Sequence, residues 1–147
     1  MKKEEKNSFY ALLKDAYSKN NQIALDKIQE RYTYGHCMDL AIAFHRLYGF
    51  EIQVTLVLDK DKSWIGHAWA SRKDGSFLDV MGLYTDSIEL QSFGDKVITG
   101  LDEKDLYQYM DEPPLESDIN QALILAKCIM KKISPEKYLL QEKQFSL

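Results

Sequence analysis

Cysteine, proline and glycine are scarce in this chain of 147 residues, which contains two, three and seven of them. The two cysteines, Cys37 and Cys128, are too few for a disulfide scaffold, and so little proline and glycine excludes a collagen-like or low-complexity chain. No apolar run approaches the roughly 18–20 residues of a membrane span. The charged first residues are not followed by an apolar segment, so we expect no signal peptide and a reducing, cytoplasmic setting in which thiols stay free.

Neither sign of charge dominates the chain, which has 19 Lys and Arg against 23 Asp and Glu and a formal net charge of −4. Nucleic-acid-binding surfaces need clustered positive charge to displace counterions from phosphates, and here acidic and basic residues are interspersed. We therefore expect neither a nucleic-acid partner nor a membrane. The composition predicts one soluble globular domain over residues 1–147. Within it we expect a charged tail at 1–7, a core at 33–100 and C-terminal helices at 102–143.

Apolar periodicity predicts helices around a small antiparallel sheet, which is an α+β fold. The segment 37–48 repeats apolar residues on one face, and it is followed by Gly49, the residue type that most often ends a helix. The segment 51–58 is rich in β-branched residues that alternate with polar ones, as expected for a strand. Helices are predicted over residues 8–19, 23–32, 37–48, 102–110, 117–133 and 134–142, and strands over 51–58, 64–71, 76–81 and 96–99.

Three residues of the predicted core have side chains suited to nucleophilic catalysis. Cys37 opens a predicted helix, where the helix dipole and free N–H groups favour a thiolate and can bind the oxyanion formed when sulfur attacks a carbonyl. His67, in a neighbouring strand, can accept the thiol proton and return it to a leaving group. Asp79, in the next strand, can hold the imidazole in one tautomer. Together they predict a Cys-His-Asp triad.

The hairpin between the second and third predicted strands decides whether His67 and Asp79 can meet. A two-residue loop would place Asp79 on the face of the sheet away from His67. A three-residue loop, 73–75, would place Asp79 opposite Trp69, which is diagonal to His67 on the same face. The third residue of such a loop is left-handed, a conformation suited to Gly75. We therefore predict the three-residue loop.

Four segments around these residues resemble the transglutaminase-like core of the papain-like cysteine enzymes. They read GHCMDLAIA from Gly35, GFEIQVT from Gly49, GHAWA from Gly66 and GSFLDVMG from Gly75. In that family a nucleophilic cysteine begins a helix, a strand follows, then a His-Ala-Trp strand, then a strand that ends in the catalytic aspartate. Val80 stands where the family often has proline. The resemblance covers residues 35–82 and implies that Cys37 is the nucleophile, His67 the general base and acid, and Asp79 the orienting carboxylate.

The resemblance further implies an enzyme that needs no metal or organic cofactor and acts on an amide or peptide carbonyl through a thioester. Water as the acceptor would give deamidation or proteolysis of a protein or peptide substrate, and an amine would give a crosslink. The short chain is similar to compact bacterial or phage versions used as toxin or effector domains, which would act in a target cell's cytoplasm. Trp64 and Trp69 are the predicted substrate-binding residues, and Gln29, Tyr34 or Trp64 could supply a side-chain oxyanion donor.

Other interpretations of the same residues stay open. The groove around Cys37 and the two tryptophans could instead hold a partner in a non-catalytic binding module. His36, next to Cys37, is an alternative base, although neighbours in sequence seldom face each other on a helix. A zinc site would combine the three candidate catalytic residues with His36 or His45, but the chain has no CxxC, HxxxH or HExxH spacing.

Overall fold

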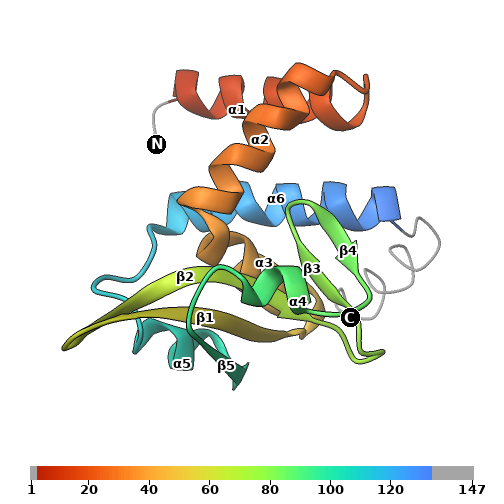
Figure 1. Cartoon of the computed structure of the whole chain (residues 1–147). Helices are drawn as coiled ribbons and strands as arrows, with labels where there is room; N and C mark the ends of the chain where they lie inside the picture. The colour runs from red at the N-terminus through yellow and green to blue at the C-terminus, as the bar shows by residue number, and fades with distance from the viewer. Residues whose placement is uncertain (1–2, 134–147) are drawn as a thin grey trace.

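The computed structural model describes residues 3–133, which are built around a five-stranded antiparallel sheet (Figure 1). The strands are ordered β4-β3-β2-β1-β5 across the sheet. The predicted α+β class is therefore confirmed. The strands are β1 (Glu51–Asp59), β2 (Lys62–Ser71), β3 (Phe77–Asp79), β4 (Gly82–Tyr84) and β5 (Lys96–Leu101). The helices are α1 (Lys3–Tyr17), α2 (Gln22–Tyr34), α3 (Cys37–Tyr48), α4 (Ile88–Gln91), α5 (Glu103–Tyr107) and α6 (Glu116–Ile133).

Helix α3 lies between the sheet and the other long helices. It packs against β1, β2 and β3, and also against α2 and α6. Apolar side chains of α1, α2, α3 and α6 form one core cluster, and those of α3, β1, β2 and α5 contribute to a second cluster next to the sheet. The start of α3 is therefore held from both sides. Within residues 3–133, no helix is both long enough and apolar enough to cross a lipid bilayer.

The two ends of α3 follow from local sequence. Gly49 has a left-handed backbone with a φ of 72°, which glycine adopts without a steric penalty, and its N–H donates to the His45 carbonyl at 2.9 Å. At the other end, Gly35 and His36 form the turn that separates α2 from α3. The predicted helix over 37–48 is therefore confirmed, and Cys37 is its first residue.

The β2–β3 hairpin has the predicted register. Ala70 pairs with Leu78, and the chain reverses through the loop 73–75. The third loop residue, Gly75, has a φ of 86°, where a residue with a Cβ would be strained. Because side chains alternate between the two faces of a strand, one residue more or less in this loop would move Asp79 to the opposite face.

Several boundaries differ from the sequence predictions. Helix α1 begins at Lys3, so the chain is helical within the stretch predicted as a charged tail. Strand β2 begins at Lys62, which pairs with Asp59 at the exposed end of a hairpin, where polar residues suit a strand as well as a loop. Strand β4 and helix α4 were not predicted, because three or four residues are too few to establish a period. The predicted helix over 134–142 lies outside the described residues.

Candidate active site

Cys37 lies at the N-terminus of α3, where it is 6% exposed and belongs to the core cluster next to the sheet. The first N–H groups of a helix have no intrahelical partner, and the helix dipole places positive partial charge at this end. The N-cap residue, His36, makes no side-chain hydrogen bond to them. An anionic oxygen formed beside Cys37 would therefore find backbone donors in place.

His67 lies in the middle of β2, opposite Thr55 of β1, and has no exposed surface. Its Nε2 atom is 2.9 Å from the Oδ2 atom of Asp79, a buried hydrogen bond. The other ring nitrogen, Nδ1, is buried and makes no hydrogen bond of ordinary geometry within residues 3–133. The His67 ring also interacts with the Cys37 side chain, which contributes to the raised pKa of the imidazole. The three predicted residues therefore come together in the fold.

Opposing influences set the protonation of His67. Burial lowers the pKa of the imidazole, whereas the hydrogen bond to Asp79, the contact with Cys37 and the charges of both groups raise it, from 6.5 to about 9. Within the described residues Nδ1 makes no hydrogen bond of ordinary geometry, and catalytic contacts often tighten only when substrate binds. The raised pKa favours the doubly protonated ring beside the Asp79 carboxylate and the Cys37 sulfur.

Asp79 is the last residue of β3 and is 4% exposed. Its Oδ1 atom accepts a hydrogen bond from the Met81 N–H at 2.8 Å, while Oδ2 faces His67. Burial raises the pKa of Tyr84 in β4, and the charge of Asp79 and a hydrogen bond to it raise that pKa further, so the phenol stays protonated and donates to the carboxylate. Because both oxygens act as acceptors, the orientation of the carboxylate is well defined.

Phe93, in the segment between α4 and β5, covers the His67 ring. The two ring centroids are 4.5 Å apart and the planes are inclined by 28°. A Cβ on Gly66 would lie 2.1 Å from the Phe93 carbonyl oxygen, so only glycine lets this segment approach β2. Sequence reasoning missed Phe93 because it lies in a loop without periodicity. The available signal was Gly66, since glycine inside a strand often marks a close backbone approach.

The two predicted substrate-binding tryptophans have different environments. Trp69 is 1% exposed, and its indole N–H donates to the Gln53 side-chain oxygen at 3.0 Å. Its ring stacks beside His67, with centroids 6.1 Å apart, so Trp69 packs against the histidine within the core. Trp64 is 47% exposed and lines a cavity of about 300 Å³ together with Met38, the second residue of α3.

The other two histidines are engaged elsewhere. The Nδ1 atom of His45, near the end of α3 opposite to Cys37, is 2.8 Å from the Phe50 carbonyl oxygen. His45 therefore does not join Cys37 in a zinc site. The Nδ1 atom of His36 is 2.7 Å from a carboxylate oxygen of Asp39, one turn along the same helix. His36 therefore pairs with a carboxylate of its own helix, whereas His67 pairs with a carboxylate of the neighbouring strand, Asp79.

Comparisons with known proteins leave this site to be interpreted from its own geometry. No family model, curated protein or solved structure matches the chain. Of the predicted oxyanion donors, Gln29 lines a separate cavity with Val80 and Leu83, and Tyr34 is 80% exposed. What the fold and the site define is an α+β domain in which a helix N-terminus and two adjacent strands bring a cysteine, a histidine and an aspartate together inside the core.

Proposed function

We propose that the protein is a cysteine-dependent acyl-transfer enzyme. The observation that carries this proposal is the buried 2.9 Å hydrogen bond between His67 and Asp79, with the second ring nitrogen left for Cys37 at the start of a helix. Buried polar atoms are rarely unpaired, so a purely structural histidine is expected to satisfy both ring nitrogens. Within residues 3–133, Nδ1 has no such partner, which suits a group that exchanges a proton with a substrate.

In the proposed reaction, the Cys37 thiolate attacks the carbonyl carbon of an amide, and the carbonyl electron pair moves onto oxygen. When this tetrahedral oxyanion collapses, the C–N bond breaks, Nδ1 of His67 gives its proton to the leaving nitrogen, and a thioester remains on Cys37. Water or an amine then adds to the thioester while His67 removes a proton from it. The C–S bond breaks and returns Cys37 as a thiolate. Asp79, by holding Nε2, keeps Nδ1 as the reacting nitrogen.

The N-terminal N–H groups of α3 would stabilise the oxyanion, since they point out of the helix end that carries the sulfur. The substrate we propose is a glutamine carboxamide or a peptide bond of a protein. The cavity lined by Met38 and Trp64 is the candidate place for it. Asp111 and Glu112 also line this cavity, and their charges would favour a cationic group such as a lysine amine as the acceptor.

Alkylation tests whether Cys37 is an activated thiol, with Cys128 as the internal control. Cys128 is more exposed than Cys37, and burial raises the pKa of its thiol. If exposure alone decided the rate, iodoacetamide would modify Cys128 before Cys37. The proposal predicts the reverse order at about pH 6–7, read by peptide mapping, and loss of that preference in His67→Gln. If Cys128 reacts first in the unmodified chain, Cys37 is an ordinary core thiol and the binding-module interpretation is favoured.

Turnover is tested by incubating the protein with a disordered glutamine-rich protein and a fluorescent primary amine. Ammonia release reports deamidation, incorporated fluorescence reports transfer to the amine, and new chain ends report proteolysis. We expect at least one product with the unmodified chain and with Cys128→Ser, and none with Cys37→Ser. Product formation that is unchanged in Cys37→Ser would contradict the proposal.

A further inference from the structure

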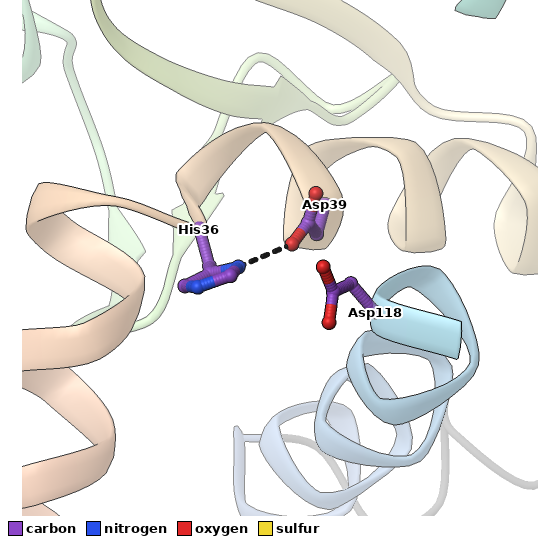
Figure 2. A group of neighbouring side chains, drawn as sticks. All are labelled: His36, Asp39 and Asp118. Carbon is purple, nitrogen blue, oxygen red and sulfur yellow. Dashed lines mark hydrogen bonds and ion pairs between the residues drawn. The ribbon is translucent and has the colours of Figure 1, made fainter. Parts of the chain in front are cut away.

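A histidine and two aspartates, none of which takes part in the proposed reaction, meet beside the first turn of α3 (Figure 2). The Nδ1 atom of His36 is 2.7 Å from Oδ2 of Asp39, and Asp118, near the start of α6, faces this pair without a hydrogen bond to either. One potential ligand atom from each residue lies within 4.8 Å of the other two. The Asp39 side chain is 7% exposed and that of His36 is 35% exposed, so the cluster is open to solvent on the histidine side.

A fourth polar group, the Tyr32 hydroxyl, lies in the field of the same carboxylates. Tyr32 is 1% exposed, and its hydroxyl has no hydrogen-bond partner in the described part of the chain. Burial raises the pKa of Tyr32; the charge of Arg31 lowers that pKa, and the charges of Asp39 and Asp118 raise it again. The Tyr32 ring also lies beside that of His36, with ring centroids 6.0 Å apart, so its unpaired hydroxyl is available to a ligand of this cluster.

Two carboxylates make the cluster acidic. Asp39 and Asp118 bring two negative charges. The guanidinium of Arg31, whose central carbon lies 5.7 Å from the Tyr32 ring centroid, brings one positive charge. A divalent cation would offset the charges of both carboxylates and would take the place of the direct contact between His36 and Asp39.

We propose that His36, Asp39 and Asp118 bind one divalent transition-metal ion, with Zn²⁺ as the best fit. One imidazole nitrogen and two carboxylates suit Zn²⁺, Co²⁺ or Mn²⁺, whereas Ca²⁺ and Mg²⁺ favour oxygen ligands alone. Three protein ligands leave one tetrahedral position for a water molecule, to which the neutral Tyr32 hydroxyl would hydrogen-bond.

The geometry of the cluster allows such an ion after small side-chain movements. Tetrahedral bonds of about 2.0–2.2 Å hold ligand atoms roughly 3.3–3.6 Å apart. His36 and Asp39 would separate slightly from 2.7 Å, and Asp118 would move toward them. The bound ion would link the first turn of α3 to α6. One of its ligands, His36, directly precedes Cys37 in the sequence.

The test is a titration of the full chain, freed of metal with a chelator, with Zn²⁺ in a calorimeter and with Co²⁺ in a spectrophotometer. We expect one equivalent to bind, and the affinity to fall at least about 10-fold in Asp118→Asn and in His36→Gln. Asp61→Asn, in the exposed β1–β2 turn, is the matched control and should bind like the unmodified chain. Circular dichroism shows whether each variant is folded, and the His36 and Asp118 variants serve as independent checks on each other.

The two cysteines are the alternative zinc ligands, so they are tested in a separate experiment. A variant with both Cys37→Ser and Cys128→Ser should retain zinc binding, and the Co²⁺ spectrum of the unmodified chain should lack a sulfur charge-transfer band. Loss of binding in the cysteine variant together with unchanged binding in Asp118→Asn would overturn the proposal, as would failure of the metal-free chain to take up Zn²⁺ at all. None of these readouts depends on acyl transfer, so this proposal and the proposed function can fail separately.

Discussion

The carboxylate of Asp79 lies 2.9 Å from Nε2 of His67, and neither side chain is more than 5% exposed. The two residues belong to adjacent strands, and the register of the β2–β3 hairpin puts them on one face. Removing one member of a buried charged pair leaves the other uncompensated, which typically costs about 3–5 kcal/mol. This pair can therefore be studied by its effect on the free energy of unfolding and on titration, before a substrate is known.

Asp79→Asn is expected to damage the site although it conserves shape. Both carboxylate oxygens accept hydrogen bonds, one from His67 and the other from the Met81 N–H. Asparagine has only one oxygen acceptor, so its amide NH₂ would face a donor or force the wrong imidazole tautomer. Loss of the negative charge should bring the pKa of His67 well below about 9, measurable by NMR titration of the imidazole. We expect turnover to fall by about 10⁴-fold, as when the carboxylate of a triad is neutralised. Asp61→Asn is the control, and an unchanged His67 titration would contradict the assignment.

The stability of the protein is expected to fall at alkaline pH because of His67. Its pKa is raised to about 9 in the folded state, against 6.5 for an ordinary histidine. A raised pKa stabilises the fold fully below pH 6.5, and this contribution is lost as the pH rises through about 9. The difference corresponds to about 3 kcal/mol in the free energy of unfolding. Urea unfolding of the unmodified chain and of His67→Gln should show this extra dependence between pH 6.5 and 9 only in the former. Parallel pH profiles would contradict the prediction.

Gly66→Ala is expected to destabilise the protein and to disturb the His67 environment. The new Cβ would collide with the Phe93 carbonyl oxygen at 2.1 Å, and a backbone atom cannot rotate away as a side chain can. Overpacking of this kind costs about 1–3 kcal/mol. Gly35→Ala is the matched control, since its Cβ would meet only the Arg31 carbonyl oxygen, at 3.9 Å. Chemical denaturation should separate the two variants, and equal stability would show that the Phe93 segment does not pack closely on β2.

Conservative changes of the two tryptophans are expected to have different effects. Trp69→Phe removes the indole N–H that bonds to Gln53 and leaves a buried oxygen without its donor, which should cost about 1–3 kcal/mol in the free energy of unfolding. Trp64→Phe changes a side chain that is 47% exposed, so stability should change by less than about 0.5 kcal/mol. If the cavity beside Met38 holds the substrate, Trp64→Phe should raise KM. A stability loss in Trp64→Phe equal to that in Trp69→Phe would contradict the assigned environments.

Structural features that depend on residues close together in the sequence could be predicted from it. The end of α3 follows from Gly49, and the β2–β3 register follows from a three-residue loop closed by Gly75, because only glycine enters left-handed backbone conformations without strain. The helix period likewise placed Cys37 at the start of α3. Together these predictions correctly placed His67 and Asp79 on the same face of the sheet. The short elements β4 and α4 escaped prediction because their positions depend on pairing with the rest of the sheet and the core.

The sequence by itself determined which chemistry is available and the local geometry that presents it: a thiol at a helix N-terminus, and an imidazole and a carboxylate on adjacent strands. Only the tertiary structure decided which aromatic ring covers His67, that Trp69 is buried, and that Asp118 lies beside His36 and Asp39. The physical reason is that helix and strand periods specify the direction of a side chain within its own element. Contacts between segments distant in the chain depend on how whole elements pack, which no local spacing encodes.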